Sequence, residues 1–229
     1  MIGFQWRLIL ALTIFSLTVA ATGQVKPSIP QRMFNQQAFV GLISDVPPAV
    51  YATAKLDYEL DGADGVMHFS SCQEIENTDG KAIIESQYGL FRLLTMNCLA
   101  LRRHTEGLDA TRSYFPLQLS GSFVATLPAT VTVDIGGQNI ESKAETPLRA
   151  AQKGWRASRA PHGGIKIITE GDERTYLIMS RADFDRDGNE DLLIRIDWAA
   201  RNGSGRAFDL VQLSKTSANG PILVSWRAH

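Results

Sequence analysis

The sequence lacks most of the residues and motifs that mark common catalytic and metal sites. Its 229 residues include only four histidines and two cysteines. It contains no Gly-x-Ser-x-Gly, His-Glu-x-x-His or Gly-x-x-x-x-Gly-Lys-[Ser/Thr] motif. Basic runs are also absent and the formal net charge is −1, which argues against a nucleic acid as a partner. No residue is therefore assigned a catalytic role from the sequence.

Long apolar runs are absent except at the N-terminus. Arg7 supplies a positive charge, an apolar stretch follows from Leu8 to Val19, and Ala20 and Ala21 provide small residues suited to cleavage. The stretch is short for a membrane span. We expect residues 1–21 to be a secretory signal peptide, with a retained N-terminal anchor as the alternative. After cleavage we expect no membrane span, and a periplasmic or secreted location in a bacterium.

The two cysteines, Cys72 and Cys98, agree with export. Cysteine pairs of exported proteins are usually bridged, because the compartment is oxidising. Their spacing is not the Cys-x-x-Cys spacing of redox-active pairs. We expect a structural disulfide between them, and two free buried thiols are the alternative.

One stretch has a residue pattern that specifies a chemistry, the binding of a hard cation. Acidic residues alternate along it, and Gly188 after the third of them permits a tight turn with positive φ. Calcium accepts six to eight oxygen ligands, whereas magnesium takes few carboxylates and zinc prefers histidine and cysteine. We expect a structural calcium ion, and a solvated acidic turn is the alternative. The expected ligands are the side chains of Asp183, Asp185, Asp187 and Asp191 and the carbonyl of Asn189.

The flanks of this stretch differ from those of an EF-hand. Position 12, counted from Asp183, is Ile194 instead of the bidentate glutamate, and alternation from Leu192 to Trp198 predicts a strand rather than a helix. Asp-Phe-Asp-x-Asp-Gly-x-x-Asp-Leu-Leu-Ile resembles the calcium loop of FG-GAP and VCBS repeats, which occur in β-propeller blades of secreted and cell-surface proteins. The resemblance covers about residues 175–198, in one copy. It implies a calcium ion between two strands.

The remaining patterns predict an α+β fold, with a mixed region at 22–155 and an antiparallel β region at 156–229. The clearest helix runs from Lys81 to His104, with Asp79 as N-cap and Gly107 closing it. Its apolar residues recur every three or four positions. They are Ile84, Tyr88, Phe91, Leu94, Cys98 and Leu101. The expected C-terminal strands form an antiparallel meander and are Ile165–Thr169, Arg174–Ser180, Asp191–Ala199, Phe208–Lys215 and Ile222–Arg227.

Weaker patterns predict the other elements. Short helices are expected at Asn35–Ser44, at Cys72–Asn77 and from Thr146 to about Gly154. Strands are expected at Ala49–Leu60, Val66–Phe69 and in the interrupted stretch Ser113–Ile135, and a loop at Arg156–Gly164.

These patterns favour an exported, non-catalytic protein in which calcium stabilises a platform for a protein or glycan partner. A periplasmic inhibitor or immunity-type protein is one alternative. A hydrolase with a site assembled from scattered residues is another, and His68 and His162 are its candidate bases. Glu74 and Glu76 form a carboxylate pair that we interpret as surface residues.

Overall fold

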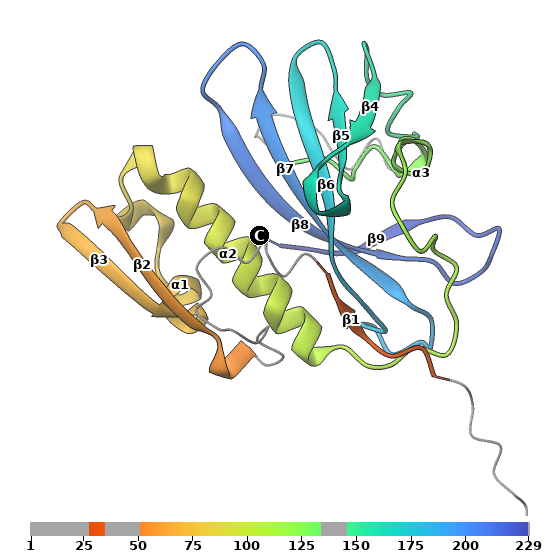
Figure 1. Cartoon of the computed structure of the whole chain (residues 1–229), viewed down its shortest axis with the longest axis horizontal. Helices are drawn as coiled ribbons and strands as arrows, with labels where there is room; N and C mark the ends of the chain where they lie inside the picture. The colour runs from red at the N-terminus through yellow and green to blue at the C-terminus, as the bar shows by residue number, and fades with distance from the viewer. Residues whose placement is uncertain (1–27, 35–50, 134–145, 229) are drawn as a thin grey trace, which may run out of the picture.

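A computed structural model of the chain describes residues 28–34, 51–133 and 146–228. Within these ranges the fold is mixed, with three α-helices and a seven-stranded sheet (Figure 1). The signal peptide and the helix expected at Asn35–Ser44 lie outside the described residues. The strands are β1 (Arg32–Met33), β2 (Lys55–Gly62), β3 (Gly65–Ser71), β4 (Arg156–Arg159), β5 (Ile165–Ile168), β6 (Asp172–Ala182), β7 (Asp191–Ala200), β8 (Arg206–Ser214) and β9 (Leu223–Arg227). The helices are α1 (Cys72–Asn77), α2 (Glu85–Glu106) and α3 (Gly121–Thr126), with 3₁₀ turns at Tyr51–Thr53, Gly80–Ala82 and Pro161–Gly163.

The large sheet is an antiparallel meander in the order β4-β5-β6-β7-β8-β9. Along this edge of β6, the first half of the strand pairs with β5 and the second half pairs with β1, where Met33 lies opposite Ser180. The five strands expected from Ile165 onward are confirmed as β5 to β9. They were predictable because their alternating apolar residues are separated by glycine-containing turns.

Helix α2 packs against one face of this sheet, with the β2–β3 hairpin on the far side of the helix (Figure 1). It begins at Glu85, because Asp79 caps the preceding 3₁₀ turn at Gly80–Ala82 instead. It ends at Glu106, and Gly107 closes it as the C-cap, as expected. Of the predicted apolar stripe, Tyr88 is 45% exposed, so the buried face starts at Phe91.

A buried polar contact also connects α2 to the sheet. Asn97, on the buried face of the helix, accepts a 2.6 Å hydrogen bond from Nη1 of Arg195 on β7. The same guanidinium donates to both carboxylate oxygens of Asp197, at 2.7 and 2.8 Å. Because a buried charge needs such partners, this contact helps to fix the position of α2 on the sheet.

The disulfide between Cys72 and Cys98 is present, with the two Cα atoms 5.2 Å apart. It connects the start of α1 to the middle of α2, and both residues are buried. The helix at Cys72–Asn77 and the return strand after the Gly65 turn are confirmed. The strand expected from Ala49 begins only at Lys55, after a 3₁₀ turn.

The other face of the sheet is covered by residues 113–133, and here the sequence prediction was wrong. The expected strand Ser113–Ile135 is absent from the described part of this stretch, which holds α3 and turns. Ser120 caps α3 by accepting a hydrogen bond from the Phe123 amide, and apolar side chains of the segment pack onto the sheet. Arg227 donates to the carbonyls of Thr130 and Thr132. Those carbonyls are therefore used by a side chain rather than by a neighbouring strand.

Two neighbouring predictions were also wrong. The helix expected from Thr146 is only a turn, closed by hydrogen bonds to the Pro147 carbonyl. The loop expected at Arg156–Gly164 contains the edge strand β4. All four residues of β4 are exposed, and its sequence has no apolar alternation that would predict a strand. The strand forms through its pairing with β5.

Candidate metal site

The acidic stretch forms the connection between β6 and β7, as the sequence predicted. The last strand pair joins Ala182 to Asp191, and residues 183–190 lie between. Ile194, which replaces the EF-hand glutamate, is fully buried in β7. The stretch is therefore a hairpin loop on a sheet and not the link between two helices.

The aspartates fold the loop through their own carboxylates. Asp183 accepts hydrogen bonds from the amides of Asp187 at 3.1 Å and Gly188 at 2.8 Å. Asp185 accepts from the amide of Asp187 at 3.2 Å, and Asp187 accepts from that of Asn189 at 2.7 Å. Aspartate commonly forms such turns with the amide two residues ahead. Arg186 and Gly188 have φ values of 67° and 84°, so the chain coils tightly at both positions.

This coiling brings three carboxylates together. One oxygen of each of Asp183, Asp185 and Asp187 lies within 4.8 Å of the others. Asp183 is buried, while Asp185 and Asp187 are exposed. None of the ion pairs among the described residues involves these three side chains. No basic side chain among the described residues therefore offsets the repulsion between these carboxylates, and the group could hold a metal ion.

Asp191 and Asn189, the other expected ligands, lie next to this group. Asp191 is buried, and its Oδ2 atom accepts hydrogen bonds from the Phe184 amide and from Gln212 Nε2, both at 3.1 Å. Burial, reinforced by the charges of Asp185 and Asp187, raises the pKa of Asp191 to about 7. Asn189 donates from Nδ2 to Asp187 at 2.8 Å. Both assignments as ligands stay predictions.

A segment after α2, residues 108–112, supports the loop at both ends. Leu108 and Asp183 exchange backbone hydrogen bonds of 3.0 and 2.9 Å. At the other end the carbonyl of Gly188 accepts from the amide and hydroxyl of Thr111, at 2.8 and 2.9 Å, and from the Arg112 amide at 3.2 Å. The segment therefore runs beside the loop and is hydrogen-bonded to both of its ends. Nothing in the local sequence indicates this pairing, because the partners are more than 70 residues apart.

The end of the loop carries a buried ion pair that the sequence analysis missed. Glu190 lies 3.1 Å from Arg181 of β6, with side chains 2% and 0% exposed. Glu190 also accepts a 2.5 Å hydrogen bond from Ser113 and lies 3.4 Å from Arg32 of β1. Because removing one partner of a buried pair is costly, this contact fixes the chain where β7 begins.

The histidines and glutamates considered as catalytic candidates do not come together in one cluster within the described ranges. His68 lies 4.0 Å from Glu59, and both side chains are more than half exposed. His162 is exposed in the 3₁₀ turn before β5. Glu74 accepts hydrogen bonds from Ser70, which lower its pKa, whereas burial raises the pKa of Glu76 against the opposing effect of Arg102.

One histidine outside the prediction, His104, is buried on α2. Its Nδ1 atom lies 2.7 Å from the hydroxyl of Ser180 on β6, and burial lowers its pKa. Ser180 is fully buried and also donates to the carbonyl of Arg32. We interpret the pair as a packing contact between helix and sheet.

Comparison of the chain with protein-family models, with curated proteins and with solved structures found no match. The resemblance of the loop to FG-GAP and VCBS repeats therefore stays a prediction. No helix in the described ranges has the length and apolar character needed to cross a membrane. The fold and the site together define an antiparallel sheet protein with an acidic hairpin loop that could hold a metal ion.

Proposed function

We propose that the loop from Asp183 to Asp191 binds one calcium ion and that the ion stabilises an exported, non-catalytic interaction module. The observation that carries this proposal is the convergence of three carboxylate oxygens within 4.8 Å. A divalent cation removes the repulsion between them, and calcium suits an irregular set of oxygen ligands. Side chains of Asp183, Asp185, Asp187 and Asp191 supply the charge in this proposal.

A backbone carbonyl completes the proposed ligand set. The Gly188 carbonyl is occupied by Thr111 and Arg112, which favours Asn189 as the residue whose carbonyl faces the ion. Asp191 would lose its proton when calcium binds, because a charged carboxylate is the better ligand. The proposed role is structural, since the loop joins two strands and lies apart from His68 and His162 in sequence and in secondary structure.

Export is supported by the disulfide between Cys72 and Cys98, because such bonds persist in oxidising compartments. A calcium-stabilised hairpin and a disulfide-linked helix pair would make the protein a rigid platform. We propose that its partner is a protein or a glycan outside the cytoplasm.

Isothermal titration of the metal-free protein with calcium tests the binding. We expect one site with a dissociation constant of roughly 10⁻⁵–10⁻³ M, and weaker binding of magnesium. Asp185→Asn, which removes an exposed ligand, should abolish the signal. Asp64→Asn is the matched control, because Asp64 lies exposed in the β2–β3 turn. Equal calcium binding by the wild type and Asp185→Asn would contradict the proposal.

A further inference from the structure

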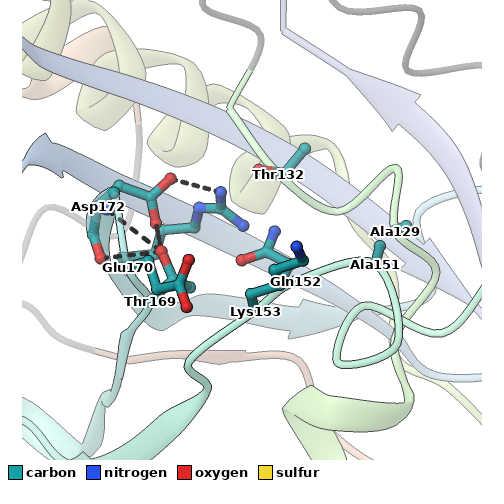
Figure 2. A pocket seen from close by; sticks show the side chains of 10 residues that line it. Ala129, Thr132, Ala151, Gln152, Lys153, Thr169, Glu170 and Asp172 are labelled. Atoms are coloured by element: carbon teal, nitrogen blue, oxygen red, sulfur yellow. Dashed lines mark hydrogen bonds and ion pairs between the residues drawn. The ribbon is translucent and has the colours of Figure 1, made fainter.

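A second polar site lies at the other end of β6 from the metal loop (Figure 2). Here an open cavity of about 360 Å³ is lined by the β5–β6 turn, the start of β6 and residues 151–153. Figure 2 shows Gln152 and Lys153 facing the turn that carries Thr169, Glu170 and Asp172. The volume is in the range of small-ligand pockets.

Arg174 is one of the residues that line the cavity, and Asp172 holds its guanidinium. The residue is 8% exposed, and its Nη2 atom donates a 2.6 Å hydrogen bond to Asp172. Asp172 also accepts from the Thr169 hydroxyl at 2.7 Å and from Trp198 Nε1 at 3.0 Å. Burial alone would raise the pKa of Asp172, but these donors and Arg174 lower it. Asp172 is therefore an ionised positioning residue for Arg174.

Several buried polar atoms of this site have no hydrogen-bond partner among the described residues. Nε and Nη1 of Arg174 are buried and have no hydrogen-bond partner within those parts of the chain, although the guanidinium lies close enough to the Tyr176 hydroxyl to oppose the rise in its pKa that burial causes. Oε1 of Gln152, across the cavity, is also buried and without a partner there. Buried polar atoms are almost always hydrogen-bonded. The cavity thus presents unused donors and an unused acceptor to whatever fills it.

The charges of the lining narrow the class of ligand. Lys153 and Arg174 are positive, Glu170 and Asp172 are negative, and the apolar part of the lining consists of Ala129 and Ala151. Among the described residues no aromatic ring lines the cavity, so this lining lacks the stacking surface that sugar-binding sites commonly use. Balanced charges of both signs complement a ligand that is neutral overall and carries both a carboxylate and an ammonium group.

We propose that this cavity binds a small zwitterion, a free amino acid or a dipeptide. Its carboxylate accepts hydrogen bonds from Arg174 and Lys153, and its ammonium group donates to Gln152 and Glu170. The site is independent of the metal loop, because the described residues that line it include none of residues 183–191.

Calorimetric titration of the calcium-loaded full chain with each L-amino acid and with glycylglycine tests this proposal. At least one zwitterion should bind, whereas acetate and methylammonium at the same concentration should bind at least tenfold more weakly. Lys153→Met and Glu170→Gln alter exposed side chains and should each weaken binding about tenfold, as expected for losing one charge-assisted hydrogen bond. Arg174→Gln should abolish it, with folding checked by circular dichroism.

Two control variants test whether the zwitterion binds in this cavity and not elsewhere on the protein. Lys55→Met, which removes an exposed lysine on β2, should bind the zwitterion like the wild type. Asp185→Asn should also keep zwitterion binding, so failure of the calcium proposal leaves this result unaffected. Absence of binding by every zwitterion would overturn the proposal. So would equally tight binding of acetate, which would mark a simple anion site, or unchanged affinity in Lys153→Met and Glu170→Gln.

Discussion

The guanidinium of Arg103 on α2 lies 5.6 Å from the ring centre of Phe184, the residue between the first two aspartates of the metal loop. Trp226 of β9 lies against the same guanidinium at 4.9 Å. Arg103 also donates to Gln212, whose amide donates to Asp191. The loop is thus connected to the helix and to two further strands, even though two of its carboxylates are exposed.

Phe184→Ala should destabilise the protein by about 2 kcal/mol, because it removes a half-buried ring from the contact with Arg103. Urea unfolding measures this loss, which should be the same with calcium and with chelator, since the contact involves no ligand oxygen. Leu117→Ala is the control and should change the free energy of unfolding by less than about 0.5 kcal/mol, because Leu117 is 75% exposed. Equal stabilities of Phe184→Ala and the wild type would contradict the described packing.

Asp191 should make the stability of the metal-free protein depend on pH. Burial raises its pKa to about 7 in the folded protein, whereas an unfolded aspartate titrates near pH 4. The folded state therefore binds the proton more tightly, and stability falls as pH rises from about 4 to 7. Calcium should reverse this loss by pairing with the charged carboxylate.

Asp191→Asn removes this titration and separates it from that of other groups. His104, for example, has a pKa lowered by burial. Its contribution to stability therefore has the opposite pH dependence and is lost as pH falls. Urea unfolding of both metal-free proteins at pH 5 and pH 8 should show the wild type losing stability relative to Asp191→Asn. A constant difference between the two proteins across this range would refute the assignment.

Reduction of the disulfide should lower the free energy of unfolding by about 3–4 kcal/mol in the chain-entropy model, since it closes a loop with a sequence separation of 26. Intact mass measured before and after reduction should differ by two hydrogen atoms. The double variant Cys72→Ala, Cys98→Ala should show the same loss, and reductant should have no effect on it. A mass unchanged by reduction would show that the thiols are free.

Asn97→Ala should destabilise the protein by roughly 2 kcal/mol, because it removes an acceptor from the buried guanidinium of Arg195. Asn97→Asp keeps a carboxyl oxygen in this place and should retain more of the stability. Ser86→Ala, at an exposed position of the same helix, is the control. If Asn97→Ala and Ser86→Ala unfold at the same urea concentration, the contact does not contribute to docking of α2.

The strongest local patterns predicted their structures well. β5 to β9 combine alternating apolar residues with clear turns, and α2 combines a periodic apolar stripe with a glycine end. The loop was predictable because aspartate and glycine fix its turns by contacts within nine residues. The disulfide was predictable because the chain holds only two cysteines.

The failures come from contacts between distant parts of the chain. The β-branched residues near Thr130 favour a strand, but Arg227 occupies their carbonyls and the segment covers the sheet instead. β4 has no apolar pattern and forms by pairing with β5. The support of the loop by residues 108–112 and the connection from Arg103 to Asp191 each join residues more than 70 positions apart. Neither leaves a signal in the local sequence.

Thermal unfolding with calcium and with chelator tests the central claim most directly. At a calcium concentration about 100 times the dissociation constant, binding should add about 2.7 kcal/mol, which corresponds to a rise of roughly 5–10 °C in Tm. Asp185→Asn should lose this rise, and Asp64→Asn should keep it. Identical melting curves of the wild type in calcium and in chelator would contradict the account.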